Sequence, residues 1–172
     1  LWFAGFRITV FIPSDILSFT VTVLWIAGIA NSFNFLDNMD GLSSGVAFIS
    51  SVLFAVFGLQ TGQLFIAGYF TLIAGVSLGF LLFNFPPALM FMGDCGSLFL
   101  GSMIALGAVV STFYQPEAPN RIFPLLIPLL ILSLPLFDTF SVIVIRLLKG
   151  THVLRGDRNH FSHRLLRLGM NT

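Results

Sequence analysis

The feature that most limits the fold is the lack of basic residues over most of the chain. Arg7 and Arg121 enclose an interval without lysine, arginine or histidine, although that interval contains acidic residues. The 172-residue chain is 56% hydrophobic and 9% charged, whereas soluble domains carry about 25% charged residues. So few charges cannot cover a water-facing surface, which excludes a soluble globular protein, a disordered chain, a coiled coil and a nucleic-acid-binding protein.

Five apolar stretches are long enough to cross a membrane as helices, which takes about 20 residues each. They are residues 16–35, 43–59, 64–85, 97–114 and 122–145. Pro128 and Pro135 fall inside the fifth stretch and should kink that helix. The sequence therefore predicts an all-α fold, a polytopic transmembrane helical bundle with about five spans and a short turn at residues 61–63.

The distribution of basic residues predicts the orientation of this bundle. Six of the eight lie in the segment 146–172, after the fifth stretch. Lysine and arginine are enriched in cytoplasmic segments, so this histidine-containing segment is expected in the cytoplasm. An odd number of spans then places the N-terminus outside, with residues 37–41 and 84–97 on the cytoplasmic face.

The first polar motif ends the first span and contains two aspartates without a local cation. Asp37 and Asp40 are three residues apart, so they would be neighbours on a helix. Two carboxylates there need a metal ion, the basic tail or a part of the protein absent from this chain; hard oxygen ligands favour Mg²⁺. Asn34 and Asp37 are expected to form the inward-facing pair, with the chain breaking at Gly41 near Asp40. Alternatively, these side chains only cap the helix and meet interfacial water.

The second polar motif is Gly-Asp-Cys-Gly-Ser, at residues 93–97. Its two glycines allow the backbone to approach a ligand closely. Ser97 is expected to cap the fourth helix. The alternative is an ordinary turn in which Asp94 is a capping acid.

The third polar motif lies in the basic segment after the fifth span. It contains Arg158, His160, His163 and Arg164. The two histidines would share one face of a helix, and the arginines would supply charge for binding phosphate. Attraction to anionic lipid is the alternative. Zinc binding is a further alternative, but only two such ligands lie close together.

Asp138 is the acidic residue inside the fifth span. An unpaired charge there would be costly, so Asp138 is expected to face the bundle or a cytoplasmic cavity, with Arg146 as a candidate structural partner. Intramembrane carboxylates also permit a rival interpretation, a transporter that relays ions or protons through Asp37, Asp40 and Asp138.

In this order and on one face, the three motifs resemble the polyprenyl-phosphate N-acetylhexosamine-1-phosphate transferase family, glycosyltransferase family 4. The matching sequences are NSFNFLDNMDGL at 31–42, FNFPPA at 83–88, FMGDCGSL at 91–98 and DRNHFSHRL at 157–165. The resemblance implies a bundle of ten or eleven spans, with residues 1–172 belonging to its single membrane catalytic domain. Members transfer a sugar-1-phosphate from a UDP-sugar to a polyprenyl phosphate, release UMP and require Mg²⁺.

The resemblance also implies roles for individual residues. The catalytic group would be Asp37, Asp40 and Asp94, with Asp40 in a supporting role. Asp94, Asn34 and Asp37 would hold Mg²⁺, with Mn²⁺ as the alternative ion. Asn34, His160, His163, Arg158 and Arg164 would bind substrate. The implied partners are a UDP-N-acetylhexosamine, with N-acetylglucosamine as the default sugar, and undecaprenyl phosphate. The protein is also expected in the bacterial plasma membrane, with its site facing the cytoplasm and with a homodimer as a possible assembly.

Two departures from the family pattern affect these expectations. Ser162 stands where the teichoic-acid and O-antigen branch has a histidine, which affects the contact with the sugar. No Asp-Asp pair occurs in the chain, although the family has one near its second and third spans. The chain is therefore expected to be the C-terminal-side portion of a longer enzyme, inactive when isolated. A catalytically dead fragment is the second rival, and direct attack and a two-step mechanism both stay open.

Overall fold

The computed structural model describes residues 14–113 and 123–148, and helices make up nearly all of this part of the chain. The helices are α1 (Asp15–Leu36), α2 (Leu42–Gln60), α3 (Leu64–Asn84), α4 (Gly93–Phe113), α5 (Phe123–Ile131) and α6 (Ser133–Leu148). The first four are long and apolar enough to cross a membrane. The expected all-α transmembrane bundle is confirmed, and the protein is a multi-pass membrane protein.

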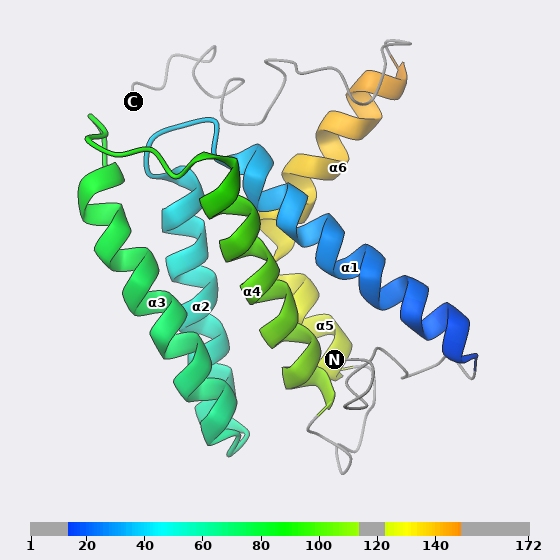
Figure 1. Ribbon diagram of the computed structural model, residues 1–172. Coiled ribbons are helices and arrows are strands. Elements are labelled where there is room, and N and C mark those ends of the chain that lie inside the picture. Colours follow the sequence, from blue (N-terminus) through cyan, green and yellow to red (C-terminus); the bar gives the residue numbers. More distant parts are fainter. Residues whose placement is uncertain (1–13, 114–122, 149–172) are drawn as a thin grey trace.

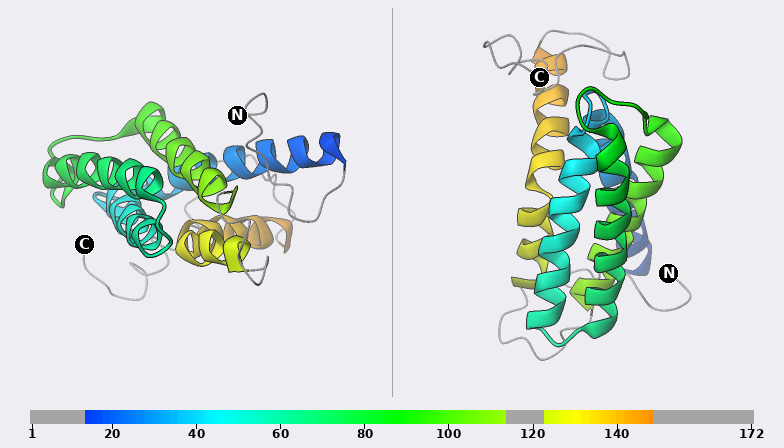
Figure 2. Two further views of the ribbon diagram at one scale, coloured as in Figure 1. Left: turned by 90° about the horizontal axis from the view of Figure 1, so that it is seen from below. Right: turned by 90° about the vertical axis from the view of Figure 1, so that its left-hand side faces the viewer.

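The helices form an elongated bundle that α1 crosses at an incline (Figure 1). α2 packs chiefly against α3, and α1 packs chiefly against α4 and next against α6. Seen from below, α1 lies between α4 and α6 (Figure 2). The end of α1, the start of α2, the end of α3 and the start of α4 meet at one end of the bundle, the upper end in Figure 1.

The expected fifth span is two helices rather than one continuous helix. α5 ends at Ile131 and α6 begins at Ser133, with a turn at Leu132. The break lies between the two prolines, as a proline-induced kink requires. Pro135 lies in the first turn of α6, where its missing N–H leaves no hydrogen bond unmade.

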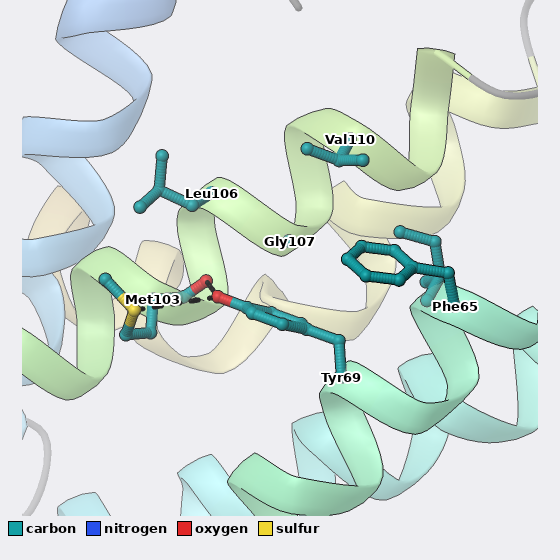
Figure 3. A pocket seen from close by; sticks show the side chains of 7 residues that line it. Phe65, Tyr69, Met103, Leu106, Gly107 and Val110 are labelled. Carbon is teal, nitrogen blue, oxygen red and sulfur yellow. Dashed lines mark hydrogen bonds between the residues drawn. The ribbon is translucent and has the colours of Figure 1, made fainter. Parts of the chain in front are cut away.

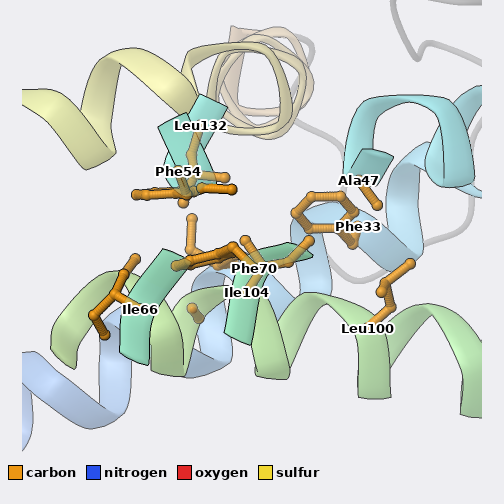
Figure 4. Packing of buried hydrophobic residues seen from close by; sticks show 12 residues of the cluster. Phe33, Ala47, Phe54, Ile66, Phe70, Leu100, Ile104 and Leu132 are labelled. Carbon is orange, nitrogen blue, oxygen red and sulfur yellow. The ribbon is translucent and has the colours of Figure 1, made fainter. Parts of the chain in front are cut away.

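Small residues bring the helices into close contact. A Cβ added to Gly101 on α4 would lie 2.9 Å from the Cα of Ala30 on α1, and one added to Gly58 would lie 2.9 Å from the Ala67 nitrogen. Such close approach stabilises membrane helices, since lipid supplies no hydrophobic drive for their association. In the buried core, Phe54 and Phe70 stack with ring centroids 4.4 Å apart (Figure 4).

The predicted boundaries of the first three spans agree with the helices to within one or two residues, and the turn between α2 and α3 is present. The prediction for the fourth span was wrong by one turn, because α4 begins at Gly93 rather than Ser97. Gly93 has a left-handed φ of 63°, which glycine adopts without strain. The first turn then contains Asp94, whose charge is favourable at a helix N-terminus.

Candidate active site

The C-terminal end of α1 lies just before the two aspartates of the first polar motif. The helix ends at Leu36, and the Asp37 N–H donates to the carbonyl oxygens of Phe33 (3.2 Å) and Asn34 (3.3 Å). The span was expected to end at residue 35 and the chain to break at Gly41, and the structure agrees, with Gly41 (φ 73°) as the N-cap of α2. Asp37 and Asp40 therefore lie in the connection 37–41 and are not neighbours on a helix, the arrangement that their spacing suggested.

Asn34 connects α1 to the start of α4. Its Nδ2 donates to Oδ1 of Asp94 and to Oγ of Ser97, each at 3.0 Å. Ser97 is fully buried and its hydroxyl donates to the Gly93 carbonyl oxygen, so it lies inside α4 and is not the predicted cap. Two residues 60 positions apart in sequence, Asn34 and Asp94, are thereby brought into direct contact.

Asp37 lies beside the same first turn of α4. Partial burial raises the pKa of its carboxyl above the usual value, a hydrogen bond from the Gly93 backbone N–H lowers that pKa, and the nearby Asp94 carboxylate raises it. Burial and like charge both disfavour the ionised form. The structure thus places Asn34, Asp37 and Asp94 together, with two carboxylates close enough to repel.

Asp40 takes part in a different contact. Its Oδ2 accepts a hydrogen bond of 3.1 Å from the backbone N–H of Ala88, in the connection between α3 and α4. Over the described ranges 14–113 and 123–148, no three carboxylate, imidazole or thiol side chains form a cluster that could hold a metal ion. Asp40 therefore does not complete a three-carboxylate site with Asp37 and Asp94.

Asn84 is a residue of this region to which the sequence analysis assigned no role. It is the last residue of α3 and 3% exposed, and its amide contacts the start of α2 and the loop before α4. Its place in the FNFPPA motif at the end of an apolar span was the available signal. A polar residue at such a position usually indicates the end of a helix, and that interpretation predicts no contacts with distant parts of the chain.

The charge around Asp37 and Asp94 suits a divalent cation. Helices α1 to α4 contain no lysine, arginine or histidine, and among the described residues Arg146 on α6 is the one with a permanent positive charge. Mg²⁺ is commonly held by one or two carboxylates, with waters and substrate phosphates as its other ligands. Asp37 and Asp94 fit that donor set.

A separate pocket of about 280 Å³ lies between α3 and α4 and is lined by apolar side chains such as Phe65, Leu106 and Val110 (Figure 3). The Tyr69 hydroxyl reaches into this region and donates to the Met103 carbonyl oxygen at 2.8 Å. Its lining contains no carboxylate, imidazole, ammonium or guanidinium group, so this pocket does not fit phosphate chemistry, and the candidate site stays at the polar end of the bundle.

The remaining predicted residues fall in two groups. Asp138 and Arg146 are both buried in α6, at 2% and 5% exposed, so Asp138 faces the protein interior as predicted. Next to Asp138, Thr139 donates to the Ser32 hydroxyl of α1 at 2.8 Å. Arg158, His160, His163 and Arg164 lie outside the described residues, and their roles stay predictions.

Comparison with known proteins decides the family. A model of glycosyl transferase family 4 matches residues 2–112, which include α1 to α4 except the last residue of α4. The chain belongs to glycosyl transferase family 4. The family match thus includes Asn34, Asp37 and Asp94, the three residues that the structure brings together.

Three relatives show which transferases the chain is similar to. The chain is 37% identical over 155 residues to a probable undecaprenyl-phosphate N-acetylglucosaminyl 1-phosphate transferase of Bacillus subtilis. The aligned region covers 90% of this chain and 42% of the relative. It is 34% identical to a decaprenyl-phosphate N-acetylglucosaminephosphotransferase of Mycolicibacterium smegmatis, with the same coverage. A phospho-N-acetylmuramoyl-pentapeptide-transferase of Desulforamulus reducens is 41% identical over 93 residues, covering 54% of this chain and 28% of the relative. The chain thus spans about two fifths of the length of its first two relatives.

Proposed function

We propose that the full-length protein transfers N-acetylglucosamine-1-phosphate from its UDP-sugar to undecaprenyl phosphate, with release of UMP. The observation that carries this proposal is the contact of Asn34 with Asp94 beside Asp37, at a helical end without local cations. The names of the two N-acetylglucosamine relatives support the sugar and the lipid acceptor.

In the overall reaction, by one step or two, a bond forms between an oxygen of the lipid phosphate and the phosphorus that carries the sugar, and the bond from that phosphorus to UMP breaks. Phosphoryl transfer depends mainly on alignment and on neutralising charge. Bound Mg²⁺ would neutralise charge that develops on the diphosphate. Asp94 and Asp37 would hold the ion, with Mn²⁺ as the alternative, and Asn34 orients the Asp94 carboxylate through its hydrogen bond.

Four predicted residues of the C-terminal segment, which lie outside the described residues, belong to the proposed site. His160, His163, Arg158 and Arg164 would contact the phosphates of the UDP-sugar, because imidazolium and guanidinium groups form strong, charge-assisted hydrogen bonds with phosphate. The excess of basic residues after α6 supports a site on the cytoplasmic side, and the bacterial origin of the relatives supports a bacterial plasma membrane. A homodimer is part of the same proposal.

The test uses the full-length protein, solubilised in detergent and supplied with radiolabelled UDP-N-acetylglucosamine and undecaprenyl phosphate. The proposal predicts labelled lipid and an equal amount of UMP, both lost on addition of EDTA and restored by Mg²⁺. Lipid-independent movement of label across proteoliposomes, without UMP, would instead support the transporter. If neither UMP nor labelled lipid forms in the presence of Mg²⁺ or Mn²⁺, the proposed function is wrong.

A further inference from the structure

The pocket between α3 and α4 has no part in the proposed transfer reaction. Its volume is about 280 Å³, and its lining includes Phe65, Tyr69, Met103, Leu106 and Val110 (Figure 3). The one hydroxyl of the lining, on Tyr69, already donates to the Met103 carbonyl oxygen at 2.8 Å. All the lining residues are among the described residues, and none of them has a buried side-chain polar atom that lacks a hydrogen-bond partner. The pocket therefore contains no group that requires a polar or charged occupant.

The pocket lies at a seam between two pairs of helices. α2 packs chiefly against α3, and α1 packs chiefly against α4, so the two walls of the pocket belong to different pairs. The walls meet closely at Gly107, where an added Cβ would lie 2.6 Å from atoms of the Tyr69 and Phe70 rings. An empty space beside such a contact forfeits the dispersion attraction of its walls, and apolar cavities do not hold water. An apolar molecule is therefore the occupant that the pocket suits.

The open side of the pocket is continuous with the lipid-facing surface of the bundle. Phe65 lines the pocket and is 79% exposed, and Leu64 and Leu72 on the same helix are each 73% exposed. Both α3 and α4 are long and apolar enough to cross a membrane, so hydrocarbon surrounds this surface. A hydrocarbon chain thus meets no polar barrier between the bilayer and the pocket.

The depth of the pocket distinguishes between two lipids that could supply such a chain. Met103 and Val110 follow Asp94 by nine and sixteen residues, which is roughly 14 and 24 Å along α4 at the rise of an α-helix. Phe65 is the second residue of α3, next to the turn at the opposite end of the bundle. The pocket is therefore in the half of the membrane away from the candidate site. A phospholipid of that leaflet begins its acyl chains at this depth, whereas a polyprenyl phosphate with its phosphate at the candidate site begins its chain in the other leaflet.

We propose that the pocket binds one acyl chain of a membrane phospholipid from the leaflet opposite the candidate site. The bound chain lies against Tyr69 of α3 and against Leu106 and Val110 of α4, and so joins the α2–α3 pair to the α1–α4 pair. A ligand that binds the folded protein stabilises it. The inference does not depend on the proposed function, because neither the two carboxylates nor the transfer reaction enters it.

The experiment counts retained lipid by native mass spectrometry. The full-length protein is placed in vesicles of phosphatidylethanolamine and phosphatidylglycerol, extracted into detergent and washed, and the mass of each lipid that stays identifies it. Val110→Phe fills the pocket. Val76→Phe is the matched control, because Val76 is 70% exposed on α3 and does not line the pocket. We expect Val110→Phe to retain one phospholipid fewer per molecule than both the wild type and Val76→Phe.

A second readout is the melting temperature of the delipidated protein in detergent. Added phosphatidylglycerol should raise it in the wild type and in Val76→Phe, and raise it less in Val110→Phe. Equal lipid counts in the three proteins would overturn the inference. So would a lost lipid with the mass of a polyprenyl phosphate. If Val110→Phe does not fold, Leu106→Phe in the pocket and Leu72→Phe on the exposed face of α3 make the same comparison with the same outcomes.

Discussion

The two ends of the bundle are closed in different ways. At the turn between α2 and α3, the Gln63 N–H donates to the Gly58 carbonyl oxygen at 2.8 Å and the Thr61 N–H to that of Phe57 at 3.0 Å. At the opposite end, Asn34 bonds to residues 60 and 63 positions away, and Asp40 bonds to a residue 48 positions away. One end is joined by local backbone contacts, and the other by polar side chains from distant parts of the chain.

This difference distinguishes a connection that only reverses the chain from one that builds a site. A tight turn needs glycine conformations and close packing, which Gly62 and Gly58 provide. The other end brings two carboxylates together without a basic residue in α1 to α4. Like charges in a partly buried place destabilise the fold, so their presence there points to a function.

Among the variants that compare the two ends of the bundle, the largest predicted effect comes from Asn34→Leu, tested against Thr61→Ala at the opposite end. Leucine removes the donor to both Asp94 and Ser97, so UMP release by the full-length protein should fall about 100-fold. The Thr61 hydroxyl donates only within its own region, to the Phe57 and Gly58 carbonyl oxygens, so that variant should stay within about twofold. Equal effects of the two variants would remove the distinction between the ends.

Gly58→Ala should have an intermediate effect, on stability alone. The new Cβ would lie 2.9 Å from the Ala67 backbone nitrogen, and overpacking of this kind costs about 1–3 kcal/mol. Gly68→Ala is the matched control, because its Cβ meets nothing within 4 Å. Denaturant unfolding in detergent measures both. A rate of UMP release per folded molecule that fell in Gly58→Ala would show that this end contributes to the site after all.

The smallest effect is predicted for Asp37→Asn in the absence of divalent ions. Burial and the Asp94 carboxylate raise the pKa of Asp37, with the Gly93 N–H opposing them, so the ionised form destabilises the folded state at neutral pH. The neutral variant should be more stable there by less than about 1 kcal/mol, because solvent screens a half-exposed group.

The pH dependence of this difference has a defined sign. A carboxyl whose pKa is raised on folding destabilises the protein above its folded pKa, and that penalty disappears as the pH falls below its ordinary value of 3.8. Melting curves without divalent ions should therefore show an advantage of Asp37→Asn at pH 7 that shrinks toward pH 4. A constant or growing advantage would contradict the assigned electrostatics.

The sequence predicted much of the fold because membrane helices follow from the length of apolar runs alone. It predicted α1, α2 and α3 nearly to the residue, and the turn at Thr61. It did not predict the break at Leu132 as a helix end, because a proline indicates a kink without showing how the flanking turns repack. It placed the start of α4 at Ser97, since serine is a common cap and the conformation of Gly93 depends on the neighbouring connections.

The site was predictable in composition and less so in geometry. Asn34, Asp37 and Asp94 stand out as polar residues at the ends of apolar helices, and the structure brings them together. The helical spacing of Asp37 and Asp40 was misleading, because local hydrogen bonds end α1 before Asp40. Asn84 was missed because its importance lies in partners 40 or more residues away, which no local pattern reveals.

The most direct test of the central claim, that the polar end of the bundle is a phosphoryl-transfer site, is UMP release by Asp94→Asn in the full-length protein. Asparagine keeps the size of the side chain and an oxygen that can accept from Asn34, but it removes the charge that would bind Mg²⁺. We expect UMP release with saturating UDP-N-acetylglucosamine, undecaprenyl phosphate and Mg²⁺ to be abolished, while the variant melts like the wild type. Near-normal turnover with Mg²⁺ would show that the charge of Asp94 is not needed and that the polar end is not the phosphoryl-transfer site.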